Sequence, residues 1–178
     1  LDEVRDYAAP IVIKKSPVNL ESLIREIWQQ VSTAQTPTEQ ESKIEFSIHV
    51  SDGFPDAILA DRSRLGQVIW NVIRNAWTAC DSEHGKIMVD LDYTRNNRGA
   101  IQIIIADNGP GIPDSNIPLI FEPFFTTNTK GTGLGLAICK RIVDAHNGTI
   151  ALINNNLGGA SFLCEIPMEF DLATPSKD

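Results

Sequence analysis

Basic residues are scarce in this sequence. Its 178 residues hold 15 Lys and Arg against 23 Asp and Glu, so the formal net charge is −8. Nucleic-acid binding through the phosphate backbone needs a basic surface, and the charge balance argues against that class of function. Long apolar runs are missing as well, because none approaches the roughly 18 residues expected of a membrane-spanning helix.

Cysteine is also rare. Cys80, Cys139 and Cys164 are far apart, odd in number and set among apolar residues, and no Cys-x-x-Cys pair occurs. The pattern predicts neither a disulfide framework nor a zinc site, but reduced thiols packed in a core, which fits a cytoplasmic location. The chain starts at leucine and in the middle of a helical pattern. We therefore expect a piece of a longer parent protein, whose other parts are free to include a membrane anchor.

Hydrophobic residues make up 42% of the chain, enough for one domain with its own core. Helical spacing of apolar residues predicts three helices, from Asn19 or Ser22 to about Val31, from Asp61 to Cys80, and from Leu134 to Ala145. Short apolar or alternating runs predict five strands, at 43–50, 86–93, 100–106, 149–153 and 160–166. The segments 32–42 and 107–130 are predicted as loops. This order predicts an α/β (α+β) two-layer sandwich, with about three helices on one face of a mixed sheet of about five strands.

The second helix carries two asparagines four residues apart. Asn71 and Asn75 would lie one above the other on the helix, beside its apolar stripe. Two such residues also fit an ordinary solvated face. Asparagine is a poor helix former, however, and a neutral amide oxygen is a suitable ligand for a hard cation that already sits on phosphates.

A glycine-rich turn follows the apolar strand 100–106 directly. Asp107 is an ionised acceptor at the strand end, and Gly109 and Gly111 allow close approaches that side chains forbid. Loops at the ends of buried strands often carry binding sites. The competing interpretation is a turn closed by its own aspartate.

A second glycine-rich segment, Gly131–Leu136, opens the last helix. Main-chain N–H groups at a helix start, without Cβ atoms in the way, form an anion site. The segment lacks the Gly-Lys-Ser/Thr of a Walker loop and the spacing of a dinucleotide fingerprint, so alone it is a weak signal.

The order of these segments is more specific than any one of them. Asn71–Asn75, then Asp107–Gly111, then the aromatic run Phe121–Phe125, then Gly131–Leu136 resembles the order of boxes in sensor histidine kinases. The resemblance is to their catalytic and ATP-binding domain, which has the Bergerat fold of the GHKL superfamily. The aromatic run and the nearby glycines are most similar to kinases of the nitrogen-regulator type.

This resemblance divides the chain into three parts. Residues 1–10 would end a helix of the dimerisation hairpin, residues 11–167 would form the catalytic ATP-binding domain, and residues 168–178 would be a disordered tail. The implied function is to bind Mg-ATP and donate the γ-phosphoryl group to a histidine on a separate dimerisation domain. The implied partners are that phosphoacceptor domain, in a parent homodimer, and the receiver domain of a response regulator.

The family's base-binding roles map onto one group of residues. Asp107 would accept a hydrogen bond from the adenine amino group. Gly109 and Gly111 would let the turn pass close to the base, and Ile112 would lie against it. Ser161 matches a small hydroxyl near the adenine.

The phosphate-binding roles map onto another group. Asn71 and Asn75 would be the catalytic pair, with Asn75 as the magnesium ligand, and Lys130 would add positive charge. The triphosphate would be surrounded by main-chain donors of Gly131, Thr132, Gly133, Leu134 and Gly135.

The sequence departs from the family at informative positions. The family often has a phosphate-binding lysine where this chain has Thr78, so the phosphate charge would fall to magnesium, Lys130 or Arg64. Relatives that hydrolyse ATP, such as gyrase and MutL, usually have glutamate at the place of Asn71. An amide cannot take a proton from water near neutral pH, so we expect ATP to be held without efficient hydrolysis.

Two other functions stay open at this point. One is an ATP-driven conformational switch of the gyrase or MutL type, which Asn71 disfavours. The other is a serine-protein kinase of the anti-sigma type. His49, His84 and His146 all lack the acidic neighbour and helical setting of the family's phosphorylated histidine, so we expect the acceptor to lie elsewhere.

Overall fold

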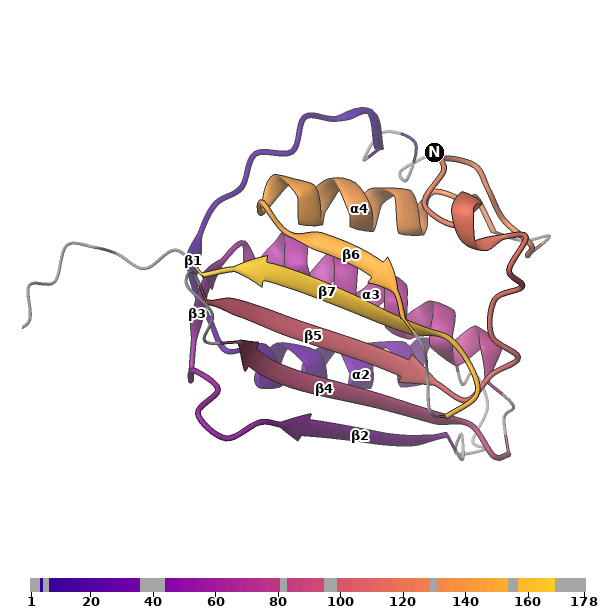
Figure 1. Ribbon diagram of the computed structural model, residues 1–178, viewed down its shortest axis with the longest axis horizontal. Helices are drawn as coiled ribbons and strands as arrows, with labels where there is room; N and C mark the ends of the chain where they lie inside the picture. Colours follow the sequence, from indigo (N-terminus) through magenta and orange to yellow (C-terminus); the bar gives the residue numbers. More distant parts are fainter. Residues whose placement is uncertain are drawn as a thin grey trace, which may run out of the picture.

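The computed structural model describes residues 4, 7–35, 44–80, 83–94, 99–128, 131–153 and 157–168. Three helices, α2 (Leu20–Gln35), α3 (Arg62–Ala79) and α4 (Gly135–Ala145), cover one face of a five-stranded sheet (Figure 1). This confirms the predicted two-layer sandwich. Within the described ranges no helix is long and apolar enough to cross a lipid bilayer.

The sheet is mixed, with strand order β2-β4-β5-β7-β6. The edge strand β2 (Glu45–Val50) runs parallel to β4 (Lys86–Thr94), and every other neighbouring pair is antiparallel. The remaining strands are β5 (Ala100–Asp107), β6 (Thr149–Leu152) and β7 (Ser161–Pro167). Side chains of the central strand β5 alternate between the two faces of the sheet, as expected where helices cover only one face. Ile101, Ile103 and Ile105 are buried under the helices.

Two details differ from the sequence prediction. Helix α2 continues to Gln35 instead of ending near Val31, so residues 32–35, predicted as loop, are helical, and the Thr33 hydroxyl donates to the Gln29 carbonyl at 2.8 Å. A two-stranded sheet of β1 (Ser16–Val18) and β3 (Ile58–Ala60) is present in addition to the five predicted strands.

Cysteines 139 and 164 are buried and free, as expected, and burial raises the pKa of each thiol to about 12. Cys80 is free and half-buried. Of the segment 1–10, Val4, Tyr7 and Ala8 are helical, and the assignment of this segment to a dimerisation hairpin stays a prediction. The predicted tail lies outside the described residues except for Met168.

Asp61 joins the incoming chain to two helices. Its Oδ1 accepts from the Arg64 N–H at 3.0 Å and caps α3, while its Oδ2 accepts from the Lys14 N–H at 2.8 Å. Its own N–H donates to Nε2 of the buried His146, whose Nδ1 lies 2.9 Å from the Ile142 carbonyl in α4. His146 is therefore a structural residue, with its proton on Nδ1.

Burial works to raise the pKa of the Asp61 carboxyl, but backbone N–H groups of Lys14, Arg64 and Ser63 outweigh it and lower the pKa below the ordinary value. A lowered pKa means that folding favours the ionised form. The resulting stability is present above the unfolded pKa of about 4 and is lost as the pH falls through the folded value.

Replacing Asp61 by alanine should lower the free energy of unfolding at pH 7 by about 1–3 kcal/mol, since a helix cap and a buried acceptor are lost. The deficit relative to the native chain should be smaller at pH 3, because below the unfolded pKa of about 4 the pH-dependent part of the stabilisation begins to be lost. Asp61→Asn is the control, because it keeps an acceptor but cannot titrate. Denaturant unfolding at both pH values measures this, and an equal deficit at both would contradict the assigned role of the charge.

Candidate functional site

A pocket of about 620 Å³ opens between the C-terminal half of α3, the turn after β5 and the start of α4. Nine of its lining residues were predicted from the sequence: Asn71, Asn75, Asp107, Gly111, Ile112, Gly131, Thr132, Gly133 and Gly135. The fold thus gathers the three predicted segments around one hollow.

A second hollow, of about 680 Å³, lies between α2 and α3. It is lined by Leu23, Trp70 and Arg64 among others, and holds none of the predicted site residues. Arg64 donates to the Gln67 side chain at 3.3 Å there and does not line the first pocket. The prediction that Arg64 meets phosphate charge is therefore not supported by its place in the fold.

Asp107 lies in the pocket with only 4% of its surface exposed. It continues the inward alternation of β5, and its Oδ1 accepts from the N–H groups of Gly109 at 2.8 Å and Ala160 at 3.2 Å. Burial raises the pKa of this carboxyl, and the two N–H groups offset only part of the rise. A Cβ on Gly159 would come within 2.2 Å of the same Oδ1, so the carboxylate requires that glycine, which sequence reasoning missed.

The turn after Asp107 is pressed against the end of α3. A Cβ on Gly109 would lie 2.8 Å from the Ala79 carbonyl oxygen, closer than such contacts allow. Gly111 has a φ of +73°, a conformation that favours glycine. Both predicted glycines are thus required by the backbone, and Ile112 follows them as part of the pocket wall.

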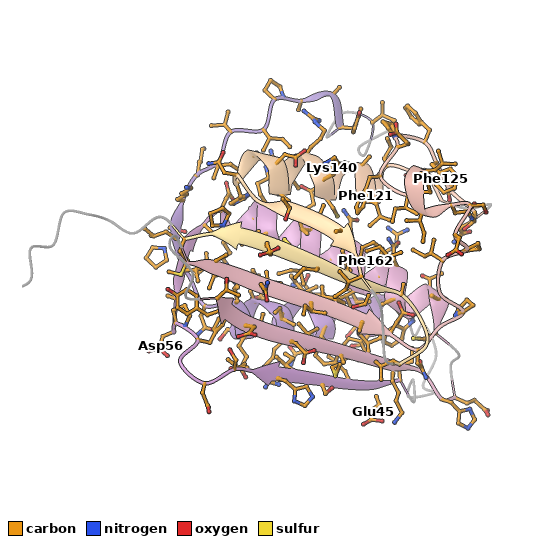
Figure 2. The ribbon with its side chains drawn as sticks, in the orientation of Figure 1. Glu45, Asp56, Phe121, Phe125, Lys140 and Phe162 are labelled. Atoms are coloured by element: carbon orange, nitrogen blue, oxygen red, sulfur yellow. The ribbon has the colours of Figure 1, made fainter. Side chains whose placement is uncertain are left out.

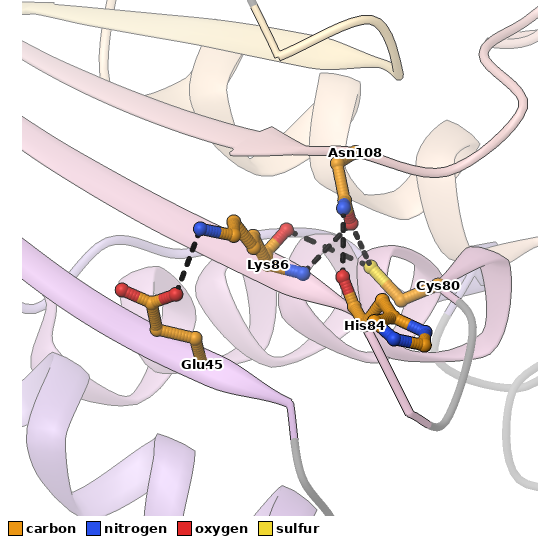
Figure 3. A network of polar contacts seen from close by, with 5 residues as sticks. All are labelled: Glu45, Cys80, His84, Lys86 and Asn108. Atoms are coloured by element: carbon orange, nitrogen blue, oxygen red, sulfur yellow. Dashed lines mark hydrogen bonds and ion pairs between the residues drawn. The ribbon is translucent and has the colours of Figure 1, made fainter.

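Asn108 fixes this turn to the connection between α3 and β4 (Figure 3). Its Oδ1 accepts from the Lys86 N–H at 2.7 Å, and its Nδ2 donates to the His84 carbonyl at 2.9 Å. The Cys80 thiol lies 3.5 Å from the same Oδ1. No sequence pattern marks Asn108 as important, because its partners come together only in the folded sheet.

On α3, the two predicted asparagines have different surroundings. Asn71 is half-buried and donates from Nδ2 to the Gly135 carbonyl at 3.3 Å, which ties α3 to the first turn of α4. Asn75 is exposed in the pocket, and its amide makes no hydrogen bond to the described part of the chain. Its oxygen is available to a ligand.

The glycine-rich segment begins α4 without a side-chain cap. By contrast, α3 is capped by Asp61, and Asn19 accepts from the Ser22 N–H at the start of α2. Unsatisfied N–H groups at a helix start carry partial positive charge, and Gly135 and Leu136 of this first turn line the pocket. Leu134 itself turns its side chain into the core and is fully buried, so only its main chain is near the site.

Gly133 closes the segment against Phe124. The Phe124 N–H donates to the Gly133 carbonyl at 3.0 Å, and a Cβ on Gly133 would come within 2.4 Å of the Phe124 carbonyl carbon. Both residues have positive φ, +68° for Phe124 and +70° for Gly133. Lys130, predicted to add charge here, lies outside the described residues.

The aromatic run divides between pocket and surface. Phe125 lines the pocket, Phe124 is 64% exposed, and Phe121 packs edge-on against Phe162 with ring centroids 6.4 Å apart (Figure 2). Ser161 is buried and does not line the pocket, whereas its neighbours Ala160 and Phe162 do. Strand alternation turns Ser161 away, so its predicted place beside a base is not supported by the geometry.

The site is poor in metal-binding acids. Among the described residues no group of three or more His, Cys, Asp or Glu gathers to hold a metal ion. A divalent cation in this pocket would depend on oxygens of a bound ligand, with an amide such as that of Asn75 as a supplementary donor. The residues therefore fit magnesium only as part of a metal–phosphate complex.

Residues 60–170 match the family described as histidine kinase-, DNA gyrase B- and HSP90-like ATPases. The chain belongs to this family. It is therefore an ATP-binding domain. The pocket is lined by α3, the turn after β5 and the glycine-rich segment that begins α4.

Curated relatives are sensor kinases. The chain is 34% identical over 176 residues to the sensor histidine kinase ZraS of Escherichia coli K12, covering 98% of this chain and 36% of ZraS. It is 35% identical over 168 residues to the histidine-protein kinase AtoS of the same strain, covering 94% of this chain and 26% of AtoS. The chain thus spans about a third of the length of these relatives or less.

Solved structures agree with this family. The catalytic domain of the histidine kinase ThkA superposes with a TM-score of 0.74 at 34% identity, covering 87% of this chain and 96% of that one. Full-length ShkA, solved in complex with AMPPNP, gives a TM-score of 0.77 at 32% identity, covering 94% of this chain and 35% of ShkA.

Asp107→Asn should separate binding from folding. An asparagine keeps the oxygen that accepts from Gly109 and Ala160, but places an N–H₂ group where the adenine amino group would donate. ATP affinity should fall about 10- to 100-fold, as for a lost hydrogen bond to a charged group. The thermal midpoint should not fall, because a buried charge is removed.

Calorimetric titration and thermal unfolding measure the two effects. The matched control is Asp144→Asn on the exposed face of α4, which makes the same substitution away from the pocket. Unchanged ATP affinity in Asp107→Asn would contradict the base-binding role. A lower midpoint with normal affinity would make Asp107 a purely structural residue.

Proposed function

We propose that this domain binds Mg-ATP and donates its γ-phosphoryl group to a histidine on a separate dimerisation domain of the parent protein. The observation that carries the proposal is the shared pocket, which has a buried carboxylate at one end and an uncapped helix start at the other. The named kinase relatives support the same function.

The base end of the nucleotide would lie at Asp107. A carboxylate there accepts from the adenine amino group, whereas guanine would place a carbonyl oxygen against it, so the site selects ATP over GTP. Gly111 and Ile112 would lie along the base, and the chain offers no second acidic side chain among the described lining residues.

The phosphate end would lie at the start of α4. Main-chain N–H groups of the segment 131–135 would donate to phosphate oxygens, where the helix start also favours negative charge. Asn75 would contribute one oxygen ligand to magnesium. When bound, the metal neutralises phosphate charge and makes the γ-phosphorus a better acceptor of a nucleophile.

Asn71 favours transfer to a protein group over hydrolysis. Its Nδ2 is engaged with the Gly135 carbonyl beside the phosphate end, and its amide has no basic lone pair to activate water. An imidazole nitrogen of the partner domain would instead attack the γ-phosphorus in line, forming the P–N bond as ADP leaves. The domain's work is positioning and charge stabilisation.

The acceptor is proposed to lie outside this chain. His146 is buried and bonded on both ring nitrogens, His49 is exposed on the edge strand, and His84 lies in the turn that Asn108 fixes. We therefore assign the acceptor to the dimerisation hairpin of a homodimeric parent. A response-regulator receiver domain would accept the phosphoryl group next, as is supported by ThkA, which has been solved in complex with the response regulator TrrA.

The chain alone should bind Mg-ATP but neither label itself nor release phosphate at an appreciable rate. Adding a helical hairpin that carries the acceptor histidine should produce acid-labile label on the hairpin only, and slowly, because the covalent tether is missing. Labelled ATP followed by acid treatment measures this. Acid-labile label on the chain alone would assign an internal acceptor, and rapid phosphate release would support an ATP-driven switch instead.

Asn75→Ala should weaken binding of Mg-ATP while binding of metal-free ATP changes little, because the lost group is a metal ligand. Titrations with magnesium and with a chelator measure the difference. Ser63→Ala, on the first turn of the same helix and away from the pocket, is the control. Equal weakening under both conditions would make Asn75 a direct phosphate or packing contact.

A further inference from the structure

One basic side chain in the pocket has no role in the function proposed above. Among the described residues that line the pocket, Arg74 is the sole Lys, Arg or His, and Asp107 is the sole acid. The whole chain carries a net charge of −8, so its average field repels an anionic nucleotide. A local cation in the pocket wall opposes that field where the ligand would lie.

The position of Arg74 on α3 places it toward the phosphate end. Asn71 touches Gly135 at one end of the pocket, and Ala79 touches Gly109 at the other. At about 1.5 Å per residue these two contacts are about 12 Å apart along the helix axis. Arg74 is then about 4.5 Å from the level of Asn71 and about 7.5 Å from the level of Ala79.

Arg74 also shares a helix face with the other pocket residues of α3. Positions 71, 74, 75 and 78 follow the spacing of one face, and all four line the pocket. Thr78 is a poor substitute for a cation, because its hydroxyl turns back and donates to the Arg74 carbonyl at 2.9 Å. It also lies about one turn farther from the glycine-rich segment.

The other arginines of α3 are directed elsewhere. Arg62 forms an ion pair of 2.5 Å with Glu26, and Arg64 donates to Gln67; both line the hollow between α2 and α3. Within the described chain, Arg74 is thus the arginine of α3 that reaches the pocket.

We propose that Arg74 binds the phosphate chain of the nucleotide and supplies the positive charge that Thr78 cannot. A guanidinium group presents paired N–H donors that match two phosphate oxygens, which suits a di- or triphosphate better than a nucleoside. The proposal rests on the proposed function, because it assigns a residue to the same ATP site. Arg74 would thus discriminate between nucleotides with different numbers of phosphates, and would not affect which base is bound.

The test compares native chain, Arg74→Ala and Arg74→Lys in titrations with ATP, ADP and adenosine. Arg74→Ala should lose about 10- to 100-fold in ATP affinity, the range for a lost hydrogen bond to a charged group, and somewhat less for ADP. Adenosine affinity should not change. Arg74→Lys should keep only part of the ATP affinity, because lysine retains the charge but lacks the paired donors. The salt dependence of ATP binding should decrease in Arg74→Ala.

Arg62→Ala is the matched control, since it removes the same charge from the same helix outside the pocket. Thermal unfolding of each variant checks that the fold is kept. Equal loss of ATP and adenosine binding in Arg74→Ala would make the residue structural and overturn the inference, as would unchanged ATP binding. Absence of ATP binding by the native chain would instead overturn the proposed function itself.

Discussion

The buried carboxylate of Asp107 is the constraint around which the pocket is arranged. An ionised group at this depth loses hydration, so the fold must supply donors close to it. The N–H groups of Gly109 and Ala160 do so, but only because β5 ends beside the start of the antiparallel strand β7. Gly159 has to be a glycine for the same reason, since any side chain there would occupy the space of the carboxylate.

Helix α3 contacts the turn next to Asp107, the start of α4 and the segment that leads into the domain. Its N-terminus is capped by Asp61, which also holds the incoming chain at Lys14. Its middle contacts the start of α4 through Asn71, and its last turn supports the base turn at Ala79. A displacement of this one helix would therefore alter both ends of the nucleotide pocket together. It would also shift the segment around Lys14, which is bonded to the N-cap Asp61.

The charge distribution explains why the site is built largely from main-chain groups. An acidic chain that binds an anionic ligand needs positive potential without a broad basic surface. The uncapped start of α4 provides part of it from backbone N–H groups, which require no basic side chain. Arg74 adds a single side-chain charge to the wall that faces them. The metal would arrive with the phosphates, because the described residues offer no acidic cluster to hold it in advance.

The sequence by itself determined the three helices, the five strands of the main sheet and the segments that line the pocket, because these depend on local patterns. The apolar stripe of α3, the alternation of β5 and the glycine-rich turns each act over a few residues. The tertiary structure decided what depends on distant segments meeting. It placed Arg64 on a helix face that turns to α2, turned Ser161 away from the pocket and brought Arg74 to the pocket wall. It also brought Asn108 to the strand β4 at Lys86 and Gly159 against the Asp107 carboxylate. Spacing along one helix shows which residues share a face, but only the packing of α3 between α2 and α4 decides which face meets the ligand.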